Sequence, residues 1–161
     1  MKKLIAVLIA LLVTQCVFAS VVVHVRDTSG KDIGTVKADN TIYGLLLTPN
    51  LRDLPPGIHG FHIHDLPCCG KDGMCAGGHL DPMKTNRHRG PYASGHLGDL
   101  PVLIVDNNGR ATLPVLAPRL KICNLYNHSL MIHAGGDNYS DKPEKLGGGG
   151  ARIACGVFPE Y

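Results

Sequence analysis

The chain has 161 residues, a length typical of one domain, and a formal net charge of +3 at pH 7. Only 18% of its residues are charged, and no basic run or aromatic-interleaved basic stripe marks a nucleic-acid surface. The composition therefore excludes a strongly basic nucleic-acid-binding protein and a low-complexity chain. It leaves a small globular domain that can bury a core.

The N-terminus has the features of a secretory signal peptide. Lys2 and Lys3 form a short positive start, and residues 4–13 form a nearly unbroken apolar run. Residues 17–19 then offer a small-residue cleavage site before Ser20. The apolar run is too short to span a bilayer, so the pattern favours a signal peptide over a membrane anchor.

We expect residues 1–19 to be removed and residues 20–161 to form one exported domain without membrane attachment. The alternative is an N-terminal core helix or a retained anchor. It is disfavoured because the residues that follow have the pattern of a strand that opens a domain. Lipidation of Cys16 is disfavoured as well, because Gln15 stands where bacterial lipoproteins have a small residue. Without the leader, the formal charge falls from +3 to about +1.

The first third of the remaining chain predicts β-strands. Short apolar and β-branched runs alternate with clusters of turn residues, the pattern of strands joined by tight turns. A Pro-Asn pair is expected to end the third strand, and a Pro-Pro-Gly sequence precedes the fourth. The expected strands are residues 21–26, 33–37, 41–48 and 58–64.

The rest of the chain alternates between long loops and strands. Residues 65–98 form a loop dense in Gly, Pro, His, Cys and charge, and loops of this length are usually functional. Residues 100–115 read as a hairpin around Asn107-Asn108-Gly109, because two apolar runs flank an Asn-Gly turn. Strands are then expected at residues 129–133 and 152–157, with a second Gly-rich loop at 134–151.

No segment shows a sustained helical period with caps. Short strands separated by turns indicate an all-β sandwich or barrel. Both long loops begin at strands that carry histidine, which suits a rigid β scaffold that displays a site on its loops.

Seven side chains have the chemistry of metal ligands. His62 and His64 form an H-x-H pair on one face of an expected strand, so two imidazoles can reach one ion. Imidazole suits copper and zinc, and a carboxylate can complete a zinc tetrahedron. Two four-coordinate sites would need eight ligand positions, so one imidazole would have to serve twice. The candidates are His62, His64, His79, His88, His96, Asp99 and His133.

Six ordered motifs resemble those of copper/zinc superoxide dismutases, and the stretch from Leu146 to Gly156 resembles the bacterial periplasmic branch. The resemblance runs from about Gly57 to Val157. The motifs are Gly60-Phe61-His62-Ile63-His64, Ala76-Gly77-Gly78-His79-Leu80-Asp81-Pro82, Lys84-Thr85-Asn86-Arg87-His88-Arg89-Gly90-Pro91, Gly95-His96-Leu97-Gly98-Asp99-Leu100, Met131-Ile132-His133-Ala134-Gly135-Gly136-Asp137-Asn138 and Gly147 to Gly156.

The resemblance implies a Greek-key β-sandwich or flattened β-barrel with two long functional loops. It also implies the ligands: His62, His64, His79 and His133 for copper, and His79, His88, His96 and Asp99 for zinc. Outside the ligands, it implies that Asp137 links a copper-site histidine to a zinc-site histidine and that His59 braces the copper site. Arg152 matches the arginine that orients the superoxide anion.

The implied activity is dismutation of superoxide to oxygen and hydrogen peroxide, with copper cycling between Cu(II) and Cu(I). Zinc would be structural and would tune His79, which would also supply a proton as its bond to copper breaks. The expected setting is the periplasm, and a homodimer is possible. The alternatives are a non-catalytic copper-binding or copper-delivery module on the same scaffold, and a structural or haem-binding protein. The complete ligand set and Arg152 favour the enzyme, and no haem-attachment motif is present.

Removal of the leader leaves five cysteines, and an oxidising compartment permits disulfides. The resemblance implies one bridge, from a cysteine just after the H-x-H motif to one in the last strand, and Cys69 and Cys155 match these positions. Cys68 is an adjacent competitor. Cys68 or Cys75 can pair with each other or with Cys123, and sequence does not decide between these pairings. The loop at 65–78 is shorter than is usual in the periplasmic branch.

Several other residues have ordinary interpretations. His24 and His128 are expected to be surface or strand histidines. Lys142 and Lys145 are either solvated loop charges or charges that raise the anion concentration near the copper channel.

Overall fold

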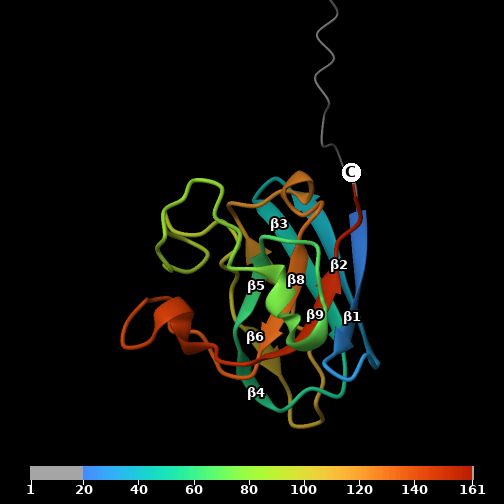
Figure 1. The fold of residues 1–161 in the computed structure, drawn as a ribbon. Coiled ribbons are helices and arrows are strands. Elements are labelled where there is room, and N and C mark those ends of the chain that lie inside the picture. Colours follow the sequence, from blue (N-terminus) through green and yellow to red (C-terminus); the bar gives the residue numbers. More distant parts are fainter. Residues whose placement is uncertain (1–19, 161) are drawn as a thin grey trace, which may run out of the picture.

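The computed structural model describes residues 20–160, so the predicted signal peptide at residues 1–19 lies outside the described residues. Within that range the chain forms strands and short 3₁₀ helices only, in agreement with the all-β prediction (Figure 1). The strands are β1 (Ser20–Asp27), β2 (Asp32–Thr41), β3 (Gly44–Leu51), β4 (Gly57–His59), β5 (Phe61–His64), β6 (Leu103–Val105), β7 (Val115–Ala117), β8 (Ser129–His133) and β9 (Arg152–Val157). The 3₁₀ helices are η1 (Lys71–Ala76), η2 (Ile122–Asn124) and η3 (Lys145–Gly148).

Seven strands form one curled antiparallel sheet in the order β5-β8-β9-β1-β2-β3-β7. Strands β4 and β6 form a separate two-stranded sheet. Neighbours such as β5 and β8, or β3 and β7, are far apart in sequence, so long connections cross between them (Figure 1). The result is the predicted flattened barrel.

Alternating apolar residues build the core. In β1, Val23 and Val25 are buried while their neighbours His24 and Arg26 are exposed, which is the period-two pattern of a strand with one solvated face. Strands β2 and β3 bury their own apolar residues against the same interior. Strand β5 differs because all four of its residues are buried. One of its faces therefore meets the core and the other is covered by the long loops.

The strand expected at 58–64 is broken at Gly60 into β4 and β5, which belong to different sheets. The Gly60 amide donates to the Gly135 carbonyl at 2.7 Å. A Cβ atom at this position would lie 3.1 Å from Cε1 of His62, so only glycine fits comfortably. The expected end of the third strand at Pro49 is also wrong, because β3 runs through Pro49 and pairs it with Val36 of β2.

The predicted hairpin at residues 100–115 is wrong in its strand pairing. The turn forms, with the Asp106 amide donating to the Arg110 carbonyl at 2.8 Å. Beyond it the two arms diverge, because β6 pairs with β4 and β7 pairs with β3. An Asn-Gly turn fixes only the reversal of the chain. Here the buried side chains of each arm find partners on different sheets, which helps to close the barrel.

Two long segments, residues 65–102 and 134–151, connect β5 to β6 and β8 to β9, and parts of both project from one side of the barrel (Figure 1). They correspond to the two predicted functional loops. Among the described residues, no helix is long and apolar enough to cross a membrane.

Candidate metal centre

Three histidines come from adjacent strands of the curled sheet. His62 and His64 share one face of β5, which pairs antiparallel with β8, and β8 ends at His133. The Nε2 atoms of His64 and His133 lie 3.4 Å apart. Together with His79, these rings offer nitrogen atoms that all lie within 4.8 Å of one another. We call this group the copper-side cluster: His62, His64, His79 and His133.

In each strand histidine, the ring nitrogen that points away from the cluster is hydrogen-bonded. His64 Nδ1 donates to the Gly77 carbonyl at 3.0 Å, and His133 Nδ1 donates to the Gly150 carbonyl at 3.2 Å. His62 Nε2 lies 2.7 Å from Asp137 Oδ2. These bonds fix the orientation of each ring and leave the other nitrogen directed into the cluster.

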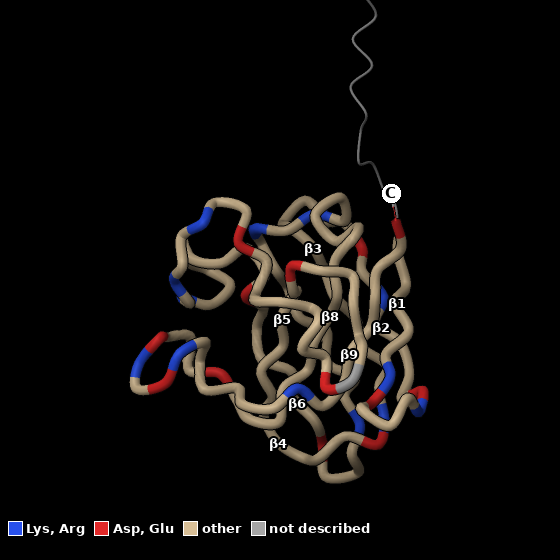
Figure 2. Tube along the Cα trace, in the orientation of Figure 1, with Lys and Arg blue, Asp and Glu red and all other residues tan. Residues whose placement is uncertain are grey.

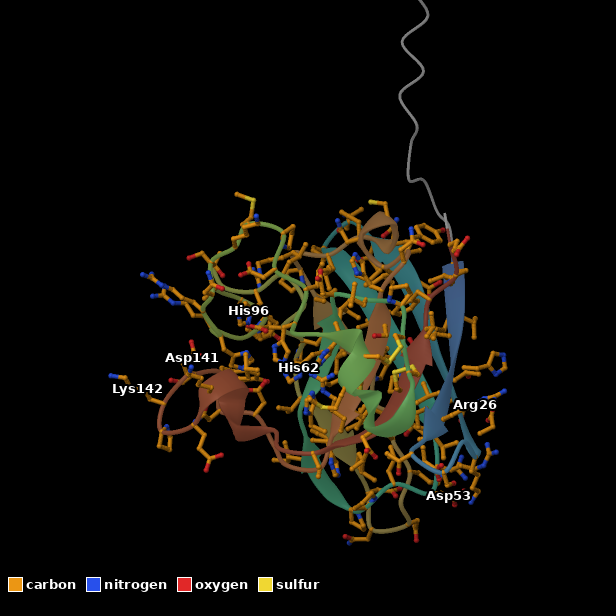
Figure 3. All side chains as sticks on the ribbon, in the orientation of Figure 1. Arg26, Asp53, His62, His96, Asp141 and Lys142 are labelled. Carbon is orange, nitrogen blue, oxygen red and sulfur yellow. A yellow bond between two sulfur atoms is a disulfide. The ribbon has the colours of Figure 1, made fainter. Side chains whose placement is uncertain are left out.

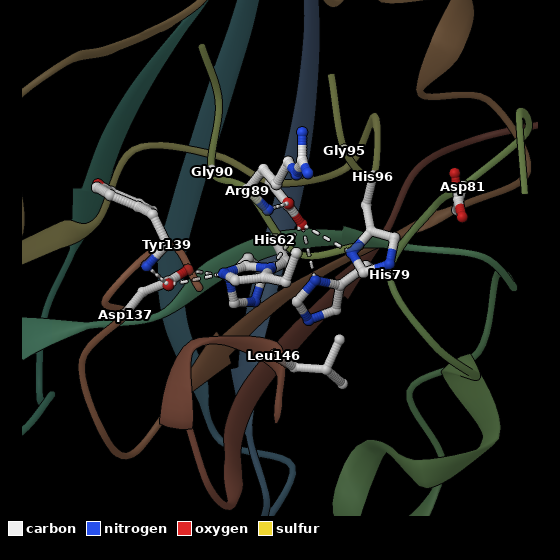
Figure 4. Close-up of polar contacts among 12 residues, drawn as sticks. His62, His79, Asp81, Arg89, Gly90, Gly95, His96, Asp137, Tyr139 and Leu146 are labelled. Carbon is white, nitrogen blue, oxygen red and sulfur yellow. Dashed lines mark hydrogen bonds and ion pairs between the residues drawn. The ribbon is translucent and has the colours of Figure 1, made fainter. Parts of the chain in front are cut away.

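The second group is carried by the long loop at 65–102. His79, His88, His96 and Asp99 offer ligand atoms within 4.8 Å of one another, and we call them the zinc-side cluster. Oδ1 of Asp99 lies 2.9 Å from His79 Nδ1, 3.0 Å from His88 Nδ1 and 3.3 Å from His96 Nδ1 (Figure 4). His79 belongs to both clusters, with Nδ1 on the zinc side.

Asp137 connects the two clusters. Its Oδ2 meets His62 Nε2 and its Oδ1 meets His88 Nε2, each at 2.7 Å (Figure 4). Its Oδ1 also accepts the Tyr139 amide at 2.7 Å. His59 lies behind the copper-side cluster, with Nδ1 2.7 Å from the His133 carbonyl oxygen. The structure therefore places Asp137 between His62 and His88, and His59 against the backbone of His133.

The glycine run at 147–150 has a steric reason. A Cβ atom at Gly147 would lie 2.0 Å from Asp137 Oδ1 and 2.9 Å from His88 Nε2. At Gly149 it would lie 3.1 Å from Cγ of His133. Gly147 also has a φ of 76°. The backbone of this loop thus packs directly on the site, and only residues without a side chain permit that approach.

Burial keeps the strand histidines neutral. It lowers the pKa of His62 to about 3, that of His64 to about 2 and that of His133 to about 4. The neighbouring His79 adds to the effect in each case. Neutral imidazole is the form that binds metal, so this cluster is ready to do so near neutral pH.

The zinc side is electrostatically different. Burial alone would raise the pKa of Asp99, but hydrogen bonds from His79, His88 and His96 hold it well below its usual range. Burial opposes charge on His88 as well, yet its contacts with Asp137 and Asp99 raise its pKa to about 9. The zinc side therefore contains a carboxylate, Asp99, that remains charged, whereas the copper side consists of imidazoles.

The residues present fit copper and zinc. Among the described residues, two buried ring nitrogens, His62 Nδ1 and His79 Nε2, have no hydrogen-bond partner, and His88 Nδ1 contacts Asp99 Oδ1 at 3.0 Å. An unsatisfied buried polar atom is costly, and each of these faces one of the clusters. Four imidazoles suit copper, and three imidazoles with one carboxylate suit tetrahedral zinc.

Arg152 stands at the start of β9 and is paired with His133 in the strand register. It is half-buried, and its guanidinium donates to the carbonyl groups of Gly73 and Gly77, each at 2.6 Å. Lys142 and Lys145 are exposed on the projecting loop, which also carries Asp141 and Glu144 (Figures 2 and 3). The alternating signs leave that loop without a concentrated positive charge.

The part of the chain that the structure describes contains two disulfides. Cys69 is joined to Cys155 of β9, the bridge that the resemblance implied. Cys68 is joined to Cys75, one of the pairings that sequence left open. Cys123 is exposed and takes part in neither bridge. His24 is exposed on β1, and His128 Nδ1 donates to the Asp65 carbonyl at 2.7 Å, so neither belongs to the site.

Arg119 and Asp141 also support the site, and sequence reasoning missed both. The Arg119 guanidinium donates to the carbonyl groups of Gly90, Pro91, Gly95 and His96. Asp141 accepts the His88 amide at 2.9 Å and the Leu146 amide at 3.3 Å. An arginine that donates to backbone carbonyls has no local sequence signature. For Asp141, the only indication in the sequence is that an acidic residue lies in the second predicted loop.

Comparisons with known proteins agree with this geometry. A family model described as "Copper/zinc superoxide dismutase (SODC)" matches residues 32–158. A protein from Legionella pneumophila named "Superoxide dismutase [Cu-Zn]" is 59% identical over 126 residues, which cover 78% of this chain and 77% of that protein.

Two solved structures are similar over most of the chain. Cu/Zn superoxide dismutase from Brucella abortus has 47% identity and a TM-score of 0.81, covering 86% of this chain and 99% of its own. The solution structure of the monomeric enzyme from Salmonella enterica has 54% identity and a TM-score of 0.75, with coverage of 87% and 99%.

Proposed function

This chain belongs to the copper/zinc superoxide dismutase family, and from that premise we propose how its own residues support the reaction. Its function is the dismutation of superoxide to oxygen and hydrogen peroxide, with copper and zinc as cofactors. The observation that carries the proposal is the pair of adjacent buried clusters that share His79.

The copper ion would be held by the copper-side cluster and the zinc ion by the zinc-side cluster. Bound copper supplies the one-electron chemistry by alternating between Cu(II) and Cu(I), whereas zinc has no redox chemistry and is structural. Asp137 and the carbonyl groups of Gly77 and Gly150 select the ring nitrogens that face the ions.

Arg152 is the proposed binding group for the superoxide anion. Its guanidinium is fixed by two backbone carbonyls, and β9 sets its position beside His133. A fixed charge at the place where an anion reacts stabilises it without further reorganisation. The exposed Lys142 and Lys145 are proposed to be solvated charges, because acidic residues neighbour them.

His79 is the proposed proton carrier. Its Nδ1 is held by Asp99 at 2.9 Å, whereas its Nε2 is buried and without a hydrogen-bond partner. Nε2 can therefore hold a proton and release it while Asp99 keeps the ring in place. Peroxide formation requires protons, and this nitrogen faces the copper-side cluster.

We propose that the protein acts in the periplasm after removal of residues 1–19. Two disulfides support export, because such bridges persist in oxidising compartments. Mass spectrometry of the protein from a periplasmic fraction would test the cleavage before Ser20. The homodimer stays a prediction, which sedimentation of the metal-loaded protein at several concentrations would test.

The function is tested by loading the purified protein with copper and zinc, measuring metal stoichiometry and following the disappearance of superoxide. We expect one ion of each metal per chain and rapid dismutation. The matched control is His128→Ala, which removes a histidine outside both clusters and should retain activity. A protein that binds copper stoichiometrically but does not turn over superoxide would instead support a metal-binding module.

A further inference from the structure

We propose that the Cys68–Cys75 disulfide is a positioning element that holds Arg152 in its anion-binding orientation. The bridge lies in the loop between β5 and the zinc-side cluster, and Ala76 of that loop clusters with Cys155 of β9. The proposal rests on the function given above for Arg152, and it assigns a role to two cysteines that the dismutase chemistry does not require.

The ring closed by this bridge supplies one partner of the guanidinium, Gly73, and the other partner, Gly77, lies two residues beyond Cys75. Arg152 Nη1 donates to the Gly73 carbonyl, and Nη2 donates to the Gly77 carbonyl. Gly77 O also accepts from His64 Nδ1 at 3.0 Å. One short backbone segment therefore orients both the arginine and an imidazole of the copper-side cluster, and displacement of that segment would move both.

Packing alone holds this loop weakly. Its buried apolar contact with the sheet is a separate small cluster of Ala76, Met131 and Cys155, apart from the main core. Its outer flank borders a groove of about 540 Å³ between the loop and the turn that joins β1 to β2. Gly70, Asp72 and Gly73 line one wall of the groove, with Arg152 beside them. A segment with so few buried neighbours depends on its disulfides and backbone hydrogen bonds to keep one conformation.

The backbone that presents Gly73 O is also unusual. Asp72 and Gly73 both have left-handed conformations, with φ of 61° and 64°. Such a conformation is unfavourable for a residue with a side chain and persists only where its surroundings enforce it. The Cys68–Cys75 bridge encloses both residues, and Gly70 ties the ring internally by donating its amide to Cys75 Sγ at 3.0 Å.

The two bridges have different consequences. Cys69 and Cys155 are separated by 86 residues, so their bridge restricts the whole unfolded chain and anchors the base of the loop to β9. Cys68 and Cys75 are separated by 7 residues, so their bridge restricts little beyond the loop itself. Its main effect is therefore expected on the loop and on what the loop holds.

The first test needs no catalysis. The double variant Cys68→Ser/Cys75→Ser is used because a single substitution would leave a thiol beside the Cys69–Cys155 bridge, free to exchange with it. Hydrogen exchange is measured on zinc-loaded, copper-free protein, at the backbone amides of residues 70–78 and at the Arg152 side-chain N–H groups. We expect faster exchange at both, unchanged exchange in β1–β3, and no change in the control Cys123→Ser.

The second test measures anion binding. Azide, a small monoanion that ligates Cu(II), is titrated into the copper- and zinc-loaded protein and followed optically. Loss of the bridge should weaken azide binding by about 2- to 10-fold, the range expected when a long side chain must be ordered on binding. In an Arg152→Ala background the same double substitution should have a clearly smaller effect, limited to what the loop transmits through His64.

Two outcomes overturn the proposal: unchanged Arg152 exchange in the double variant, or equal weakening of azide binding with and without Arg152. If the double variant does not fold, partial reduction and alkylation of Cys68 and Cys75 in the folded protein removes the same bridge. The same two outcomes then apply. Because the exchange measurement requires no turnover, it decides the proposal even if the protein proves inactive as a dismutase.

Discussion

The two halves of the metal centre are built in different ways. The copper-side histidines His62, His64 and His133 lie on hydrogen-bonded strands, so the register of β5, β8 and β9 places them. The zinc-side residues His88, His96 and Asp99 lie on a loop without regular structure apart from isolated bridges. That loop is held by polar contacts, chiefly the Arg119 guanidinium on four carbonyl groups and Asp99 among three imidazoles.

The two halves therefore owe their rigidity to different interactions. A strand histidine keeps its position because backbone pairing and the apolar core hold it, whether or not a metal is bound. A loop ligand depends on charged hydrogen bonds that metal binding reinforces. We therefore expect the copper-side geometry to persist in the metal-free protein and the zinc-side loop to gain most of its rigidity on loading.

The largest effect should come from the strand half. In His133→Ala, the copper-side cluster loses one imidazole, and activity should fall to background because a copper ligand is missing. The fold should persist, since β8 keeps its pairing with β5 and β9. Superoxide removal and thermal unfolding of the metal-free protein measure the two effects. An unfolded variant would show that the strand half is not independent of its ligands.

Asp99→Ala tests the loop half. It removes the carboxylate that contacts all three zinc-side imidazoles and that accepts the Arg89 amide at 3.2 Å. Zinc affinity should fall by more than the roughly 10- to 100-fold typical for loss of an outer hydrogen-bond partner. Hydrogen exchange should rise across residues 86–99 and stay unchanged in β5 and β8. Zinc affinity within 10-fold of the parent protein would contradict this assignment.

Asp137→Asn probes the connection between the halves. The amide keeps the size of the side chain but cannot accept from both His62 and His88. We expect affinity for each metal to fall by about 10- to 100-fold. Competition titrations with chelators measure the two affinities separately. A loss confined to one metal would show that Asp137 supports one half alone.

The same contrast determines what the sequence could predict. The shared face of the H-x-H pair on β5 could be predicted, because strand periodicity places alternate side chains on one face. The loop residues were candidate ligands by their chemistry, but their assignment to the two ions came only from the resemblance to a family, since no local pattern states which loop residues meet. Arg119 was missed because its partners are backbone carbonyls, which every residue has.

The errors in the fold have a related cause. The Asn-Gly turn at Asn108-Gly109 correctly marks a reversal of the chain. The pairing beyond the turn depends on where the apolar side chains of each arm are buried, and β6 and β7 pair with strands of different sheets. The break at Gly60 depends on the approach of Gly135 from a distant loop. Local propensity could specify neither contact, because both join segments far apart in the chain.

The smallest effect should come from Asp141→Ala, which loosens one loop from the other without touching a ligand side chain. Asp141 accepts the His88 backbone amide and the Leu146 amide, so it ties the zinc-side loop to the segment before β9 (Figure 3). A hydrogen bond is worth about 1 kcal/mol, so zinc affinity should fall by about 5-fold. Copper affinity should not change, because Asp141 contacts only the loop half, and this distinguishes it from Asp137. Paired chelator titrations of the two variants would decide whether the halves are coupled by the Asp137 carboxylate or by general docking of the loops.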